Sequence, residues 1–178
     1  MNINSIGFDT VIDPQAVIKR PHLMSIGSHC AIDAGAYFTT KVAIGSYVHI
    51  GPYVTVIGGA ESELIVEDFA TIAAGARIIC KGEEHLGLGL VGPTIPKIYS
   101  DRLVGGKVVI KQFANVLTNA VIFPGITIGE GAVIGANTVM HIDAEPWTIY
   151  LGNPVRKIKV RDSQNMLAYA SELMNRKL

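Results

Sequence analysis

The sequence predicts an all-β solenoid, in which short strands stack on one another as the chain coils. Three observations predict this fold class. Aliphatic residues, mostly Ile or Val, recur every six residues. Glycine often follows the aliphatic residue, and a small or β-branched residue recurs four positions after it. Because helices need apolar residues at spacings of three and four, a period of six built from β-branched residues favours strands.

The six-residue period runs, with three resets, from Ile6 to Met140. Each unit predicts one short strand and one corner, with the aliphatic and the small residue both turned inward. We call the first position of each unit its aliphatic position. All 18 of these positions hold an apolar residue: Ile6, Ile12, Ile18, Ile26, Ile32, Phe38, Ile44, Ile50, Val56, Val66, Ile72, Ile78, Ile110, Val116, Ile122, Ile128, Ile134 and Met140.

Composition narrows the classes of function. The 178 residues suit one domain, and 15 basic residues balance 15 acidic ones, which argues against a nucleic-acid partner. Glycine, proline and polar residues interrupt the longest uncharged runs, 42–60 and 112–129, so no membrane span is expected. The N-terminus lacks the basic region of a signal peptide. Two cysteines, Cys30 and Cys80, are too few for a disulfide scaffold, so we expect a soluble cytoplasmic protein with free thiols.

The tail changes character after residue 161. Apolar residues at helical spacing, with Asp162 or Ser163 as N-cap, predict a helix over 162–178. We expect it to cover the open end of the solenoid, because exposed coil ends need caps. The predicted inner face of this helix is Met166, Ala170, Leu173 and Lys177.

The repeat stops between Ile78 and Val108. The predicted solenoid domain, residues 1–161, therefore contains a loop insertion over 81–107 that is rich in glycine and proline. Insertions of this length without their own structure are uncommon and are usually functional. This one contains His85, preceded by Glu83 and Glu84. The alternative is a solvated insertion without a role.

The pattern [Ile/Val]-Gly-x-x-[Ala/Val/Thr]-x resembles the signature of the hexapeptide-repeat acetyltransferase family over about residues 6–161. Segments 73–85, 121–136 and 150–158 resemble the branch of galactoside, maltose and chloramphenicol acetyltransferases and the sugar acetyltransferases of polysaccharide pathways. Asn115 and Asn119 depart from the galactoside pattern. The resemblance implies a left-handed parallel β-helix of about six coils, three hexads to a coil. It also implies a homotrimer with active sites at subunit boundaries.

The resemblance also implies acetyl-CoA as co-substrate. His85 lies where the family has its catalytic histidine, on the excursion after a coil. An imidazole with a pKa near ~6.5 can take the proton of a hydroxyl that attacks a thioester. Family matching places Thr118, Ala136 and His141 along the coenzyme A groove, and Arg156 and Lys159 at its phosphates.

No metal is expected. Zinc carbonic anhydrases of this fold need two ligand histidines five residues apart, and no two of the five histidines are so spaced.

Two other kinds of residue near the insertion are interpreted as non-catalytic. Glu83 and Glu84 are interpreted as solvated. Cys80 is interpreted as structural, because no base accompanies its thiol.

Three functions stay open. The first is acetyl-CoA-dependent O-acetylation of a sugar hydroxyl, with His85 as general base. The second is N-acetylation of a nucleotide-linked amino sugar in surface-polysaccharide biosynthesis, whose amine depends less on a protein base. The third is a non-catalytic β-helical scaffold, against which the His-bearing insertion argues. For the acceptor, spacing does not choose among Tyr53, Tyr99, Asp101 and Arg102.

Overall fold

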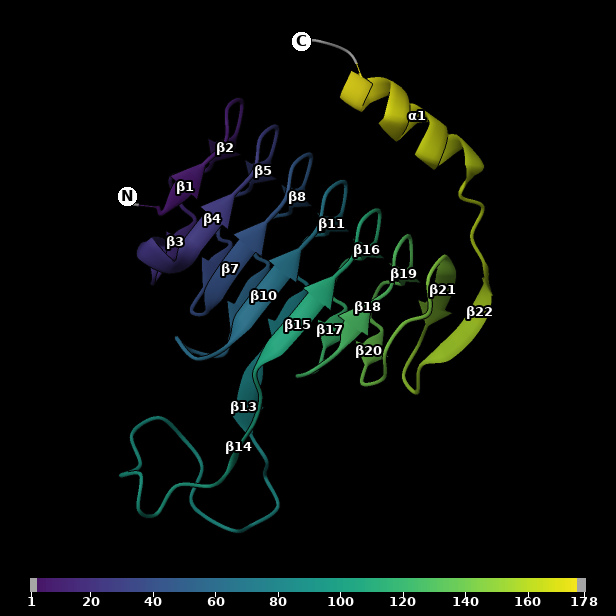
Figure 1. Cartoon of the computed structure of the whole chain (residues 1–178). Helices are drawn as coiled ribbons and strands as arrows, with labels where there is room; N and C mark the ends of the chain where they lie inside the picture. Colours follow the sequence, from purple (N-terminus) through teal and green to yellow (C-terminus); the bar gives the residue numbers. More distant parts are fainter. Residues whose placement is uncertain (1–2, 176–178) are drawn as a thin grey trace.

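The structure is a computed structural model that describes residues 3–175. Its body is a left-handed parallel β-helix with three strands to a coil, so that equivalent strands of successive coils form three sheets along the prism (Figure 1). Six complete coils are followed by one strand of a seventh, which confirms the predicted fold class.

The three sheets, here called A, B and C, follow one another along the chain. Sheet A contains β1 (Ser5–Ile6), β4 (Met24–Ile26), β7 (Lys41–Ile44), β10 (Glu63–Val66), β15 (Lys107–Ile110) and β18 (Thr127–Ile128). Sheet B contains β2 (Val11–Ile12), β5 (Ala31–Ile32), β8 (His49–Ile50), β11 (Thr71–Ile72), β16 (Asn115–Val116), β19 (Val133–Ile134), β21 (Thr148–Leu151) and β22 (Arg156–Val160). Sheet C contains β3 (Val17–Ile18), β6 (Tyr37–Phe38), β9 (Thr55–Ile57), β12 (Arg77–Ile79), β17 (Val121–Ile122) and β20 (Val139–Met140). A short 3-10 helix, η1 (Pro21–Leu23), links the first coil to the second.

The interior consists of the two predicted inward rows. From Ile26 onward, every aliphatic position of the repeat is at most 5 % exposed. The small row, which includes Ala36, Ala76 and Ala120, is equally buried. The three aliphatic positions of the first coil are the exceptions: Ile12 and Ile18 are half-buried, and Ile6 is 49 % exposed. Burial therefore follows the stacking of coils, because the inward side chains of each coil are covered by the coils beside it.

Aromatic side chains stack along the corner between sheets A and B. We call this row the aromatic ladder: Phe8, His29, Tyr47, Phe69, Phe113 and Trp147. The Tyr47 and Phe69 ring centroids are 5.0 Å apart, and those of Phe69 and Phe113 are 5.3 Å apart. From His29 onward these residues have a positive φ, a conformation that side chains other than glycine rarely adopt. Ring stacking on the neighbouring coils offsets that strain.

The coil of Gly131 has no aromatic residue at this corner. A Cβ atom at Gly131 would overlap the Trp147 ring. Trp147 thus fills the place in the ladder that this coil leaves open, and its ring lies 5.9 Å from that of Phe113.

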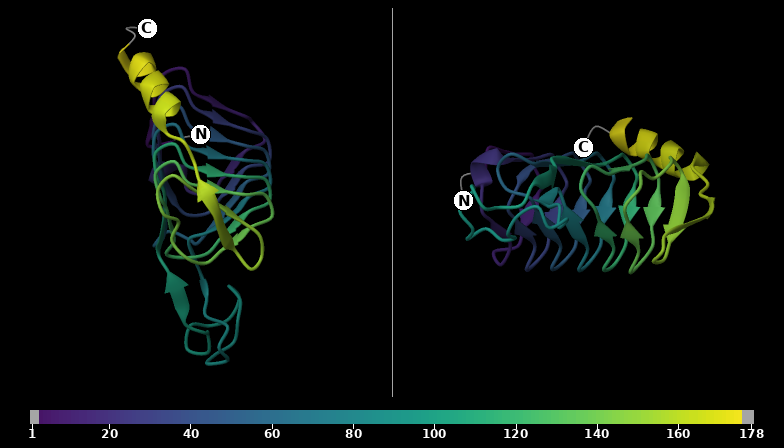
Figure 2. Two further views of the ribbon diagram at one scale, coloured as in Figure 1. Left: turned by 90° about the vertical axis from the view of Figure 1, so that its right-hand side faces the viewer. Right: turned by 90° about the horizontal axis from the view of Figure 1, so that it is seen from below.

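The C-terminal helix α1 (Gln164–Asn175) runs along the side of the prism (Figures 1 and 2). Met166, Ala170 and Leu173 line one cavity with Phe69 and Phe113 of the aromatic ladder. The expectation that the helix covers the open end is therefore wrong, because the ladder is an apolar strip that attracts the apolar face of the helix.

At the open end itself, β22 pairs antiparallel with β21. This pairing supplies hydrogen-bond partners to the last strand of sheet B, so the helix is not needed there. The predicted cap is present at the start of the helix, where Gln164 N–H donates to Asp162 Oδ1 at 3.0 Å. Lys177, predicted on the inner helix face, lies outside the described residues.

Both cysteines are free and buried in the interior. Burial raises the pKa of the Cys80 thiol to about 12 and also raises the pKa of the Cys30 thiol. Cys80 is thus protonated at neutral pH, which agrees with its interpretation as a structural residue. Within residues 3–175, no helix has both the length and the apolar character needed to cross a membrane.

Candidate active site

The insertion leaves the prism at the corner between sheets C and A, after β12. Its base is an antiparallel ribbon of β13 (Lys81–Glu83) and β14 (Leu103–Gly105), and the rest projects away from the coils (Figure 1). Gly106 N–H donates to Cys80 O at 2.8 Å and closes the base. The interruption of the repeat thus corresponds to an arm fixed at its root to the fourth coil.

His85 follows β13 and is exposed. Its φ is 58°, and its backbone N–H donates to Asp101 Oδ2 at 3.0 Å. The other oxygen of Asp101, Oδ1, accepts from Arg102 N–H at 2.8 Å. Asp101 is only 4 % exposed, so this carboxylate is buried and held by backbone donors. It fixes the unusual backbone conformation from which the His85 side chain projects.

Nothing in the sequence predicts this role of Asp101. A lone aspartate in a glycine-rich stretch has no spacing to interpret, so the sequence suggests Asp101 only as a possible contact for the acceptor. The contact joins two ends of the arm that are 16 residues apart. Only the fold of the arm brings them together.

Glu83 and Glu84 organise the arm. Glu83 Oε1 accepts from Gly92 N–H at 3.2 Å, while Glu84 Oε2 lies 4.0 Å from Arg102 Nε. Among the contacts of the described residues, neither carboxylate reaches the His85 ring. The two glutamates therefore bind parts of the arm to each other and do not orient the imidazole.

The residues expected to hold coenzyme A lie on the C-terminal coils. Thr118 and Ala136 occupy the corner between sheets B and C on successive coils and are exposed; Asn137 N–H donates to Thr118 O at 3.0 Å. Arg156 and Lys159 are exposed on β22, with Arg156 opposite Leu151, at the end of β21 nearest this corner. Thr118, Ala136 and Arg156 thus follow one edge of the prism.

His141 lies elsewhere. It follows β20 and so occupies the corner between sheets C and A, the same corner from which the insertion leaves two coils earlier. Within one chain, sheet C separates His85 and His141 from Thr118 and Ala136. The structure therefore does not bring all the predicted site residues together in a single copy.

A cavity of about 770 Å³ lies between the insertion and the first coils. That size is within the usual range of about 300–1,000 Å³ for small-molecule sites. The coils contribute Lys19, Arg20 and Tyr37 to its wall, and the insertion contributes Lys81, Glu83 and Leu103.

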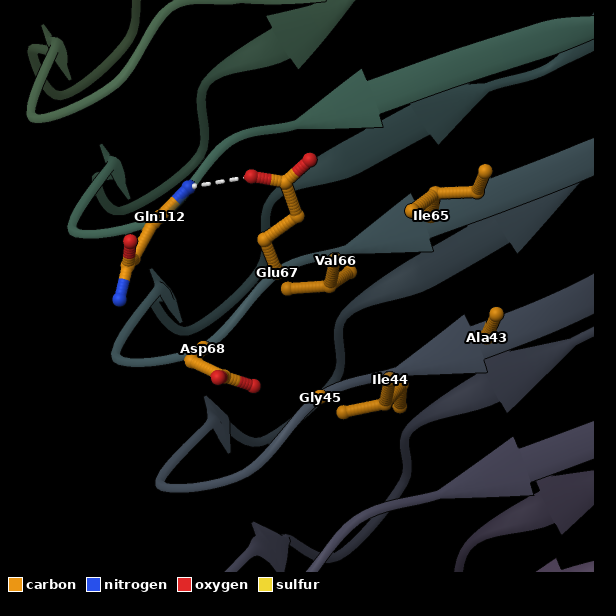
Figure 3. A pocket seen from close by; sticks show the side chains of 8 residues that line it. All are labelled: Ala43, Ile44, Gly45, Ile65, Val66, Glu67, Asp68 and Gln112. Carbon is orange, nitrogen blue, oxygen red and sulfur yellow. Dashed lines mark hydrogen bonds between the residues drawn. The ribbon is translucent and has the colours of Figure 1, made fainter. Parts of the chain in front are cut away.

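A second hollow, of about 370 Å³, lies on the outer face of sheet A. Figure 3 shows it between Ala43 and Ile65, with Glu67 and Gln112 at one side. Glu67 Oε2 accepts from Gln112 N–H at 3.1 Å, and its Oε1 lies 2.7 Å from Lys111 Nζ. The other carboxylate that lines the hollow, Asp68, accepts from Ser46 N–H at 2.7 Å through its Oδ1. Both carboxylates of the hollow are thus engaged in contacts that hold neighbouring coils together.

Metal chemistry has no geometric support in the part of the chain that the structure describes. No group of three or more His, Cys, Asp or Glu side chains there is placed to hold an ion.

Comparison with known proteins places this geometry in a family. The hexapeptide model, described as bacterial transferase hexapeptide (six repeats), matches residues 24–58. A structure of a variant of AntD, an N-acyltransferase from Bacillus cereus in complex with dTDP-4-amino-4,6-dideoxyglucose and coenzyme A, is 34% identical. It superposes with a TM-score of 0.92 and covers 99% of this chain and 93% of that one. Another AntD structure holds dTDP and 3-hydroxybutyryl-CoA.

Two curated proteins are more distant. The dTDP-4-amino-4,6-dideoxy-D-glucose acyltransferase of Escherichia coli is 27% identical over 92% of this chain and 85% of its own length. A chloramphenicol acetyltransferase of Agrobacterium fabrum is also 27% identical, over 88% of this chain and 76% of its own. Since the 34% identity extends over nearly all of both chains, on a coil built from the same six-residue unit, this chain belongs to the hexapeptide-repeat acyltransferases.

Proposed function

We propose that this enzyme transfers an acyl group from acyl-CoA to the amino group of a nucleotide-linked amino sugar, a reaction suited to surface-polysaccharide biosynthesis. The observation that carries this proposal is the likeness to AntD over the whole chain, with an amino-sugar nucleotide and coenzyme A in the AntD complex. This is the second of the three functions left open by the sequence. It replaces O-acetylation of a sugar hydroxyl as the favoured reaction.

The chemistry needs an amine, a thioester and a proton acceptor. The amine nitrogen attacks the thioester carbonyl, the new C–N bond forms, and the C–S bond breaks to release the coenzyme A thiolate. The nitrogen must lose a proton in this sequence, and an imidazole accepts it at neutral pH because its ordinary pKa is about 6.5. His85 is suited to this task, since it is exposed on the arm and its backbone is fixed by Asp101.

A second copy of the chain completes the site in this proposal. His85 lies on a different corner of the prism from Thr118 and Ala136, the residues predicted to bind coenzyme A. The proposal therefore places the groove that holds both groups between two copies. The arm also exposes large apolar side chains, among them Leu86 at 71 %, Leu88 at 76 % and Ile98 at 81 %. Exposed apolar surface of this kind marks a contact with another protein. We propose a homotrimer, which light scattering would report as three times the 19.0 kDa chain mass.

Thiol release from acyl-CoA tests the reaction. The acceptors are nucleotide-linked amino sugars, simple sugars and chloramphenicol, each with acetyl-CoA and with a larger acyl-CoA, and the variant is His85→Ala. We expect turnover of an amino sugar and a loss of less than about a hundredfold in the variant, because a free amine needs a base less than a hydroxyl does.

Two results would contradict the proposal. Turnover of a hydroxyl acceptor that falls by more than about a hundredfold in His85→Ala would restore O-acetylation. Absence of turnover with every acceptor, together with absence of coenzyme A binding, would favour the scaffold.

A further inference from the structure

The cavity between the insertion and the first coils is lined by charged side chains that have no role in the proposed transfer step. Lys19 and Arg20 follow β3 on the first coil, and Lys81 begins the insertion. Glu83 supplies the one carboxylate that lines the cavity, and it already accepts from Gly92 N–H. Because the whole chain has no net charge, three cations around one cavity are a local concentration of positive charge.

These cations differ in how they are paired. Lys81 Nζ lies 2.9 Å from the carboxylate of Glu61, which is 84% exposed. Within the described residues, neither Lys19 nor Arg20 forms an ion pair with a carboxylate. Arg20 Nη1 donates to Thr39 O, which fixes the guanidinium and leaves its other N–H groups for a ligand. Lys19 Nζ lies 5.8 Å from the centre of the Tyr37 ring. A fixed guanidinium beside an ammonium is a suitable receptor for phosphate oxygens.

The position of the cavity along the prism separates it from the expected coenzyme A phosphates. Lys19 and Arg20 lie at the first strand of sheet C, whereas Arg156 and Lys159 lie beyond the last complete coil. Five strand spacings of about 4.8 Å, or about 24 Å, separate β3 from β20. The insertion leaves after β12, the fourth of these six strands, so His85 lies on an arm that begins between the two groups of cations.

On the basis of the proposed function, we propose that the cavity binds the diphosphate of the nucleotide-linked amino sugar, with Lys19 and Arg20 contacting its phosphate oxygens. The acceptor then approaches the arm from the first coils, and acyl-CoA approaches it from the last coils. The two ligands meet where the arm carries His85. The specificity for a nucleoside diphosphate thus lies in the first coil, outside the residues that perform the transfer.

Calorimetric titration of the full chain with dTDP, and separately with coenzyme A, tests this assignment. Lys19→Ala should weaken dTDP binding about tenfold or more, as expected for loss of a charge-assisted contact, and should leave coenzyme A binding unchanged. Lys159→Ala, at the opposite end, should do the reverse. Lys111→Ala is the control for loss of a surface charge: its ammonium lies 2.7 Å from Glu67 Oε1, it follows β15 at the corner between sheets A and B, it does not line the cavity, and its loss should change neither affinity.

Arg20→Ala provides a second and independent variant, and circular dichroism reports whether it remains folded. Unchanged dTDP affinity in both Lys19→Ala and Arg20→Ala, or weakened coenzyme A binding with unchanged dTDP binding, would overturn the assignment. The second result would indicate that the cavity binds the diphosphate of coenzyme A.

Turnover separates this inference from the proposed function. A wild type that acylates an amino-sugar nucleotide, with unchanged dTDP affinity in both variants, overturns the cavity assignment alone. A wild type that binds dTDP through Lys19 and Arg20, but transfers no acyl group to any amino sugar, overturns the proposed function and leaves the cavity assignment standing.

Discussion

Each complete coil buries its inward side chains against the coils on either side, whereas the insertion leaves most of its apolar side chains in solvent. Ile72, Ile78 and Ile122 have no measurable exposure, while Leu88 and Ile98 are more than three quarters exposed. The coils are held by repeated burial, and the arm is held by a few polar contacts, such as the one from His85 N–H to Asp101. Changes in the two regions should therefore have different consequences: coil variants lose stability, and arm variants lose activity.

The largest expected effect is on the coils. Ile122→Ala removes a fully buried side chain and should lower the free energy of unfolding by about 2–5 kcal/mol. Val121→Ala is the matched control, because the neighbouring side chain on β17 points outward and is only half-buried; its cost should be clearly smaller. Urea denaturation measures both. Equal costs for the two variants would mean that the inward row does not carry the stability of the coils.

Gly131→Ala tests the corner of a coil, with an expected loss of about 2–4 kcal/mol in stability. The new Cβ atom would overlap the Trp147 ring and would also sit at a positive φ of 63°. Gly125→Ala separates these two causes, because its φ is 81° and a Cβ atom there meets no other atom within 4 Å. This control should lose only about 1–2 kcal/mol, the cost of the backbone conformation. A loss in Gly131→Ala no larger than in the control would show that the ladder does not need Trp147 at this position.

Asp101→Ala tests whether the polar contacts of the arm serve activity and not stability. We expect kcat to fall about tenfold while KM for both substrates and the melting temperature change little, because the carboxylate positions His85 through its backbone N–H. Asp101→Asn keeps one side-chain acceptor oxygen and should recover part of kcat. A large drop in melting temperature, or a loss that Asn does not rescue at all, would contradict a positioning role.

The sequence and the structure agree where a contact repeats. The inward rows were predictable because every coil has the same period. Burial of one coil on the next requires an apolar residue at the same position of each repeat. Ile6, Ile12 and Ile18 depart from the pattern because the first coil has no coil beyond it. The helix was predictable from its own spacing, but its place on the aromatic ladder was not, since nothing in its spacing states which surface will cover its apolar face.

The candidate site was predictable only where it is marked by the repeat or by its interruption. His85 stood out because the repeat breaks around it, and the structure places it on an arm, as expected. Thr118 and Ala136 follow one edge together, while His141 lies at another corner. Their roles in binding coenzyme A stay predictions. Asp101 and the cations of the cavity gave no such signal, because each is a single residue without a repeated partner.

The repeat and its interruption are enough to predict the solenoid, its inward rows and the insertion after the fourth coil, and His85 stays a prediction as the base. Only the folded chain shows which distant residues meet: Lys19 and Arg20 with Lys81 around one cavity, Asp101 with His85, and α1 with the aromatic ladder. Period and propensity do not show these contacts, because they are local properties of a chain. Contacts between an early coil and a later insertion depend on how many coils stack between them and on which corner each segment leaves.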